Sequence, residues 1–217
     1  ARDRWEIDPL AAETCPPFTP SAHFRGDLGS FWFQAEVAGP GILDRSPGLE
    51  AADERGLSPR TFRLSIREGR GLLGHLTSFF NVPAVFGSTP YQSSRYLGVD
   101  CADVLMAAYS LHKGLPLGKN DNVISVMARF PPRTKFRLSG GRLDRKVAWG
   151  RDIRPGDFLA VKYEGARIYQ HIGALYRDEN EDGWLDGGDL VLHAGPEPLH
   201  FSSLSAGAFH GEGTFAG

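Results

Sequence analysis

One cysteine and two histidines of this chain are of types that can carry out nucleophilic chemistry. Cys101 directly follows Asp100, a residue type that caps helix N-termini. Cys101 would then lie in the first helical turn, where free backbone N–H groups and the helix dipole favour the nucleophilic thiolate. His171 and His193 lie downstream, and histidine is a common general base for such a thiol. The alternative is a small buried cysteine and two satisfied strand histidines.

The elements that must position these residues are a helix and a set of strands. One apolar helical face, at positions i, i+3, i+4 and i+7, is formed by Cys101, Val104, Leu105 and Ala108. A shorter core helix is predicted over 71–80, where His75 is interpreted as a surface or satisfied histidine. Residues 158–163, 168–176 and 190–193 have the composition of strands.

The two histidines would meet if 169–176 and 190–194 paired as a hairpin centred near Asp182. Because His171 and His193 are equally far from that centre, they would face each other across the strands, with Cβ atoms about 4.5–5.5 Å apart. His193 would then hold the tautomer of His171.

The connection between these strands, residues 178–189, has the ligand spacing of an EF-hand calcium loop, with Gly183 at the sharp-turn position. The expected ligands are Asp178, Asn180, Asp182, Asp186 and Asp189 through their side chains and Trp184 through its carbonyl. The flanking elements are strands and the last ligand is Asp, whereas an EF-hand has helices and Glu. We predict a structural calcium site; the alternative is an acidic hairpin tip without a metal.

Four stretches, in this order, resemble the NlpC family of cell-wall cysteine peptidases, a branch of the papain-like superfamily. They are Asp-Cys at 100–101, Pro-Gly-Asp at 155–157, His-Ile-Gly at 171–173 and His-Ala at 193–194. The resemblance covers roughly residues 71–200. It implies that Cys101 is the nucleophile, His171 the general base and His193 the third, orienting residue.

The resemblance also implies an α+β, papain-like domain of the NlpC type over 71–217, with an antiparallel sheet and the nucleophile at a helix N-terminus. Residues 1–70 are predicted to form a small β-rich region before it. Within that region, 31–37 and 61–67 have strand character. The second alternates apolar and polar residues, which predicts a half-buried strand with an apolar face formed by Phe62, Leu64 and Ile66.

The chain departs from the family at one position. The family has a tyrosine that lines the oxyanion site where this chain has Ala84, so Tyr91 or Tyr96 would have to substitute. The backbone N–H of Cys101 would supply the other oxyanion donor. Two cysteines, Cys15 and Cys101, are too few for a disulfide framework; pairing them would silence the nucleophile.

Composition narrows the classes of partner. The 217 residues are 41% apolar and 23% charged, as in ordinary globular proteins. The net charge of −2 provides no general attraction to nucleic acid, and no apolar run approaches the roughly 18 residues of a membrane span. We expect a monomer without a transmembrane segment or a nucleic-acid partner. Nine Lys or Arg and two Asp between Arg129 and Arg154 form either a solvated face or a rim that attracts an anionic cell-wall polymer.

These observations lead to one expected function and two alternatives. The expected function is that of a thiol hydrolase that cleaves amide bonds in peptidoglycan peptides and needs no cofactor for its chemistry. It implies a periplasmic or extracellular location; the chain begins with Ala1, so its start is expected to be processed or trimmed and a signal peptide would not be visible. The alternatives are an amidase or acyltransferase with the same site, and a non-catalytic, calcium-stabilised binding module.

Overall fold

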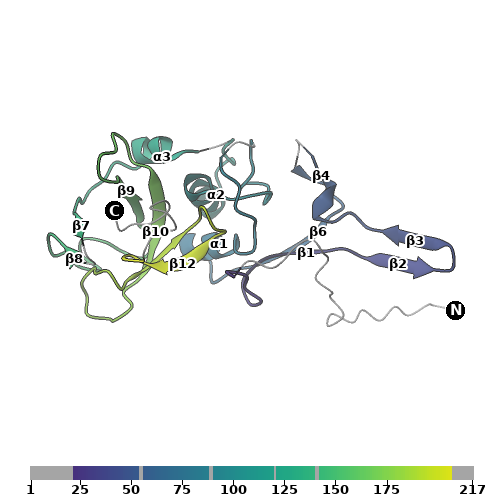
Figure 1. Cartoon of the computed structure of the whole chain (residues 1–217), viewed down its shortest axis with the longest axis horizontal. Helices are drawn as coiled ribbons and strands as arrows, with labels where there is room; N and C mark the ends of the chain where they lie inside the picture. Colours follow the sequence, from purple (N-terminus) through teal and green to yellow (C-terminus); the bar gives the residue numbers. More distant parts are fainter. Residues whose placement is uncertain (1–21, 54–55, 88–89, 120, 140–141, 207–217) are drawn as a thin grey trace.

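The computed structural model describes residues 22–53, 56–87, 90–119, 121–139 and 142–206 (Figure 1). Its secondary structure is mixed, with a few helices and small antiparallel sheets. The predicted α+β class is therefore confirmed. Cys15 lies outside the described residues.

The central helix, α2 (Cys101–Lys113), forms as its sequence predicts. Asp100 caps it, since one carboxylate oxygen accepts hydrogen bonds from the backbone N–H groups of Ala102 and Asp103 at 3.0 and 2.7 Å. The helix ends at Gly114, which adopts a left-handed φ of 63°. The predicted short helix is present as α1 (Leu72–Thr77).

Helix α3 (Val123–Arg129) was not predicted from the sequence. It begins at Asn122, whose side chain accepts from the Ser125 N–H while the Ser125 hydroxyl accepts from the Asn122 N–H. This reciprocal capping box satisfies two backbone donors in a segment of only seven residues.

The main sheet has four antiparallel strands in the order β12-β11-β10-β9. Their bounds are Phe158–Val161 for β9, His171–Arg177 for β10, Leu190–His193 for β11 and His200–Ser203 for β12. The first three correspond to predicted strands, and β12 was not predicted. One face of β10, with Ile172 and Ala174, packs with α2 in the larger hydrophobic core. The opposite face, with Leu175, belongs to a second, smaller core.

The register between β10 and β11 differs from the predicted one. Ala174 pairs with Leu192 and Leu175 with Val191, but Arg177 pairs with Leu190, so Tyr176 is an extra, bulged residue. Continuing this register places Gly173, and not His171, opposite His193. The prediction that the two histidines face each other directly was wrong, because the strands close at Arg177 and Leu190 and the hairpin is therefore centred beyond Asp182. The bulge at Tyr176 reduces this offset by one residue and does not remove it.

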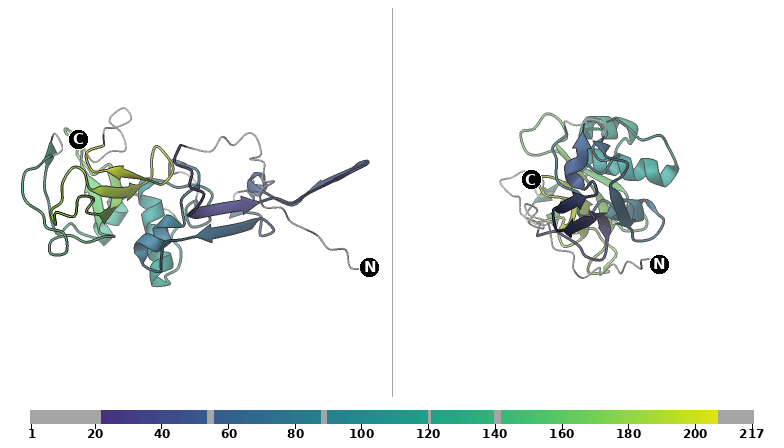
Figure 2. Two further views of the ribbon diagram at one scale, coloured as in Figure 1. Left: turned by 90° about the horizontal axis from the view of Figure 1, so that it is seen from below. Right: turned by 90° about the vertical axis from the view of Figure 1, so that its right-hand side faces the viewer.

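The N-terminal region consists of two-stranded ribbons (Figure 2). Strand β1 (Gly29–Phe33) pairs with β6 (Phe62–Ile66), and β2 (Glu36–Gly39) pairs with β3 (Ile42–Arg45) in a ribbon that projects from the rest of the molecule. The remaining short elements are a 3-10 helix at Leu49–Ala51, β4 (Ala52–Asp53) with β5 (Gly56–Leu57), and β7 (Leu138–Ser139) with β8 (Arg142–Leu143).

Strand β6 forms where it was predicted, but it is not half-buried. Phe62, Leu64 and Ile66 are 63, 46 and 40% exposed. A two-stranded ribbon has no second layer to cover its apolar face, so the alternation of apolar residues predicts the strand correctly and its burial wrongly.

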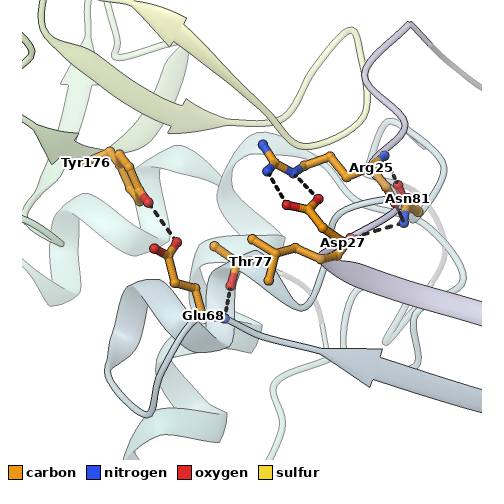
Figure 3. Close-up of polar contacts among 7 residues, drawn as sticks. Arg25, Asp27, Glu68, Thr77, Asn81 and Tyr176 are labelled. Atoms are coloured by element: carbon orange, nitrogen blue, oxygen red, sulfur yellow. Dashed lines mark hydrogen bonds and ion pairs between the residues drawn. The ribbon is translucent and has the colours of Figure 1, made fainter.

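Polar contacts join the N-terminal region to the main sheet (Figure 3). The hydroxyl of Tyr176, the bulged residue of β10, donates to Glu68 at 2.7 Å, and the Glu68 backbone N–H donates to Thr77 at the end of α1 at 3.0 Å. The side chain of Asn81 accepts from the Arg25 N–H and donates to its carbonyl.

Among the described residues, no helix is long and apolar enough to cross a membrane.

Candidate active site

The thiol of Cys101 lies at the start of α2, as predicted, and is free of any disulfide in the structure. Burial and, to a smaller extent, the nearby Asp100 carboxylate raise the pKa of this thiol to about 12, against the opposing effect of backbone N–H groups from Ile172, Ala102 and Cys101 itself. The sequence predicts a lowered pKa from the helix N-terminus alone. In the structure, burial and the capping carboxylate outweigh that effect.

The contact with Ile172 places the thiol against β10. Strand β11 ends at His193, so the paired ladder between β10 and β11 begins only at Ala174. The Ile172 N–H lies beyond that ladder and faces the Cys101 thiol. Ile172 directly follows His171 in β10, and the thiol is therefore positioned one residue along the strand from the predicted general base.

His171 and His193 are brought together despite the shifted register. A two-residue shift leaves both side chains on the same sheet face, as diagonal neighbours, because side chains alternate with a period of two. The Nε2 atom of His171 lies 3.1 Å from Nδ1 of His193, and the ring planes are nearly perpendicular, at 85°. Both side chains are buried, with 4 and 2% exposure.

A fourth residue extends this contact. Nε2 of His193 lies 2.7 Å from the hydroxyl oxygen of Ser202 in β12. The contacts give a consistent direction for the protons: with a proton on Nε2, His171 donates to Nδ1 of His193, which in turn donates from its Nε2 to Ser202. Sequence reasoning missed Ser202, because the short strand β12 was not recognised.

Two further histidines lie next to this group. His200 is the direct cross-strand partner of His193, with ring centroids 4.4 Å apart, and His23 stacks on His200 at 4.3 Å. Burial and, to a smaller extent, the charge of His200 lower the pKa of His171 to about 4. Burial also lowers the pKa of His193, with added repulsion from its three neighbouring histidines. All these effects favour neutral imidazoles.

The oxyanion site was predicted near Ala84 and the backbone N–H of Cys101. Ala84 forms a bridge with Val99, and the Val99 N–H donates to the carbonyl of Pro83, so the position of the family tyrosine lies close to the start of α2. Tyr96 is turned into the core, where it stacks on Phe79. The cap of α2 uses the N–H groups of Ala102 and Asp103, and not that of Cys101.

The predicted calcium loop is closed by its own hydrogen bonds. Asp178 accepts from the Gly183 N–H at 2.7 Å, Asn180 from the Asp182 N–H at 3.0 Å, and Asp182 from the Trp184 N–H at 2.8 Å. The Asn180 amide donates to Asp186 at 3.0 Å. The other carboxylate oxygen of Asp178, Oδ1, is buried and has no hydrogen-bond partner in the structure.

Asp189, the last predicted ligand, is fully buried and accepts three hydrogen bonds. They come from the indole N–H of Trp149 at 2.8 Å and the backbone N–H groups of Glu179 and Asp186, both at 3.0 Å. The loop backbone is also joined to the segment before it, because Leu185 donates to the carbonyl of Val147. Hydrogen bonds from three separate donors thus fix Asp189 at the end of the loop.

Within the described part of the chain, no group of three or more His, Cys, Asp and Glu side chains is arranged to hold a metal ion. Comparison of the sequence and structure with family models, curated proteins and solved structures gives no match. Function must therefore be inferred from the site itself.

Proposed function

We propose that this protein is a thiol hydrolase that cleaves amide bonds in bacterial cell-wall peptides, with residues 71–217 forming a papain-like domain of the NlpC type. One observation carries the proposal: the Cys101 thiol faces the N–H of Ile172, the neighbour of His171, and His171 is itself bonded to His193. A helix-start thiol against the strand that carries an oriented imidazole fits the needs of nucleophilic catalysis at a carbonyl.

In the first half of the reaction, Nδ1 of His171 takes the thiol proton as sulfur attacks the scissile carbonyl carbon. The carbonyl electron pair moves to oxygen, where the backbone N–H of Cys101 stabilises the developing charge. Collapse of this intermediate breaks the C–N bond, and His171 returns the proton to the leaving amine. The product is a thioester on Cys101. His193 accepts from Nε2 of His171 and so holds the tautomer that leaves Nδ1 as the base.

In the second half, water attacks the thioester. His171 takes a proton from the water, the carbon–sulfur bond breaks, and the thiolate recovers its proton from His171. Because the pKa of the thiol is raised to about 12 and that of His171 is lowered to about 4, both groups are neutral before substrate binds. Proton transfer therefore accompanies attack, as in serine hydrolases, and does not precede it.

The proposal is tested by digesting purified peptidoglycan with the full chain and identifying the fragments by mass spectrometry. New amine and carboxyl termini at one peptide bond are expected. Cys101→Ala and His171→Ala should each abolish their release, since members of a catalytic group act as a unit, while His193→Ala should retain more activity. His112→Ala, on the same helix as Cys101, is the matched control. Release of the same fragments by Cys101→Ala would refute the assignment.

A second candidate, a non-catalytic binding module, is favoured by the raised thiol pKa. Trapping of the acyl-enzyme separates the two: an activated peptide ester should leave an acyl group on a catalytic Cys101 only when His171 is present, whereas a structural thiol should stay unmodified. A related thiol–acyl activity, that of an amidase or acyltransferase, would leave a mass-shifted acyl adduct on Cys101 from a non-peptide donor.

We further propose that loop 178–189 binds calcium in a structural role. The buried, unpartnered Oδ1 atom of Asp178 supports this, because an ionised oxygen removed from water needs a positive partner. The three hydrogen bonds of Asp189 leave it little capacity for a metal, so the first half of the loop would contribute most of the ligands. A cell-wall substrate would place the protein in the periplasm or outside the cell.

A further inference from the structure

Strand β9 forms one edge of the main sheet and offers a second candidate site. It pairs with β10 on one side, and none of the described strands pairs with its other side. The Leu175 N–H donates to the carbonyl of Asp157, and the two-residue period of an antiparallel ladder then directs the N–H and C=O groups of Phe158 and Ala160 away from β10. In the described residues these outward groups have no backbone partner.

This edge faces a cavity of about 1470 Å³. Strand β9 forms one wall of the cavity, and the segment from Phe130 to Ser139 forms another. All four residues of β9 are partly exposed, which shows that space remains beside the strand. The ring of Phe130 packs edge-on against Phe158 at 5.4 Å and provides an apolar surface beside the open edge. The cavity lining does not include Cys101, His171 or His193.

The charge around the cavity is predominantly positive. Seven of its lining residues are Lys or Arg and four are Asp or Glu. Three of the acidic groups are already engaged: Asp152 pairs with Arg151, Asp144 accepts from the Arg137 N–H, and Asp157 accepts from the Arg154 N–H. Among the described residues, the lining cations that form no salt bridge are Arg129, Arg133, Lys135, Arg137, Arg154 and Lys162.

We propose that this cavity binds an extended acidic peptide as a fifth strand of the main sheet. The outward groups of Phe158 and Ala160 supply main-chain hydrogen bonds, as in other complexes in which a peptide extends a sheet. Alternate side chains of the added strand would point to opposite faces. Carboxylates on one face would meet the unpaired cations, and apolar side chains on the other would lie along Phe130. This binding is independent of the thiol chemistry proposed for Cys101.

The experiment uses the full chain with Cys101→Ala, which removes any turnover, and a capped hexapeptide of alternating Glu and Val. Calorimetry should detect binding, and NMR should show shift changes in the amides of Phe158 and Ala160. Ala160→Pro should weaken binding at least tenfold, because it removes an outward donor that β10 does not use, and proline is tolerated at such edge positions. An unchanged melting temperature checks that the variant is folded.

Two comparisons separate main-chain from charge recognition. The double variant Arg133→Glu, Lys162→Glu should also lose at least tenfold in affinity, while Arg60→Glu, Arg70→Glu, an equal charge reversal in the N-terminal region, should not. A peptide N-methylated at alternate residues keeps its carboxylates but cannot pair as a strand. If it binds as tightly as the parent peptide, the strand proposal is overturned in favour of charge alone.

Two other occupants would also overturn the proposal. Tighter binding of a single-stranded DNA oligonucleotide at the same cations would make the cavity a general polyanion site. A dimer seen in sedimentation and abolished by Ala160→Pro would assign the open edge to a second copy of the chain. The acidic peptide is supported only if the protein is monomeric and the peptide is preferred over the oligonucleotide.

Discussion

The backbone N–H of Ile172 faces the thiol of Cys101, so the first turn of α2 lies against the first residues of β10. The thiol is held there in the protonated form by burial and by the Asp100 carboxylate. Asp100, which caps the helix, thus also disfavours the thiolate form of Cys101.

Asp100→Asn should lower the pKa of the Cys101 thiol. Asparagine caps helices about as well as aspartate, so α2 is retained while the neighbouring negative charge is lost. We expect the pH midpoint for alkylation by iodoacetamide to fall by on the order of one unit. The same change at Asp121, which caps no part of this turn, is the control. An unmoved midpoint would show that burial alone controls the thiol.

Ser202→Ala should slow turnover without weakening substrate binding. The hydroxyl contacts Nε2 of His193 and not the site of attack, so its loss affects only the orientation of the histidine pair. One neutral hydrogen bond corresponds to about 1 kcal/mol, or a roughly five- to tenfold lower kcat. Ser203→Ala, the next residue of β12, should leave kcat unchanged, and Ser202→Thr should restore part of the activity. A change in KM alone would contradict a positioning role.

The buried histidines should make the fold sensitive to acid. Burial lowers the pKa of His171 from 6.5 to about 4, so between these values the unfolded chain binds more protons than the folded one, and stability rises with pH. This one group accounts for about 3 kcal/mol. Asp103 opposes the trend, because burial raises its pKa to about 6 and the folded chain binds its proton more tightly.

His193 and His200 also have lowered pKa values, owing mainly to burial, so the histidines should outweigh Asp103. Denaturant melts between pH 4 and 7 should show falling stability towards acid pH, with a smaller pH dependence in His171→Asn. The acid limb of kcat/KM should likewise lie near pH 4 and not near the ordinary 6.5 of histidine. A fold that is equally stable at pH 4.5 and 7 would contradict this assignment.

Calcium should stabilise the loop at 178–189 through Asp178. We expect a dissociation constant on the order of 10⁻⁴–10⁻³ M, as in extracellular modules, and a raised melting temperature at millimolar calcium. Asp178→Asn should abolish both effects, whereas Glu181→Gln, an equal charge change in the same loop, should preserve them. Calorimetry without a heat of binding would leave the loop closed by its hydrogen bonds alone.

Local features were predictable from the sequence, and the long-range ones were not. The position of Cys101 depends on a cap and an apolar period within one helix, and both are visible in the chain. The strands that carry His171 and His193 were also predicted. Their register was not, because it depends on where the hairpin closes, at Arg177 and Leu190, and on a bulge at Tyr176, whose hydroxyl bonds to Glu68 more than one hundred residues away in sequence.

The remaining parts of the site depend on contacts between distant segments. Ser202 and His200 reach His193 through β12, a four-residue strand without a strong composition signal. The pKa of the Cys101 thiol is raised mainly because the thiol is buried. The spacing of apolar residues along α2 does not reveal how deeply that thiol is buried. The three bonds of Asp189 include one from Trp149, which no spacing rule links to the loop.

The projecting ribbon of β2 and β3 also determines how a protease would cut this protein. Its turn, around Pro40 and Gly41, is exposed at the tip, the kind of place where proteases cut folded chains first. A cut there would separate β1 and β2 covalently from everything that follows. The two fragments would nevertheless stay together, because β1 pairs with β6 along its length and the Ser30 N–H donates to the carbonyl of Phe80. The nicked protein would run as two bands on a denaturing gel and as one species in solution. Cys101, His171 and His193 would all lie on the larger fragment.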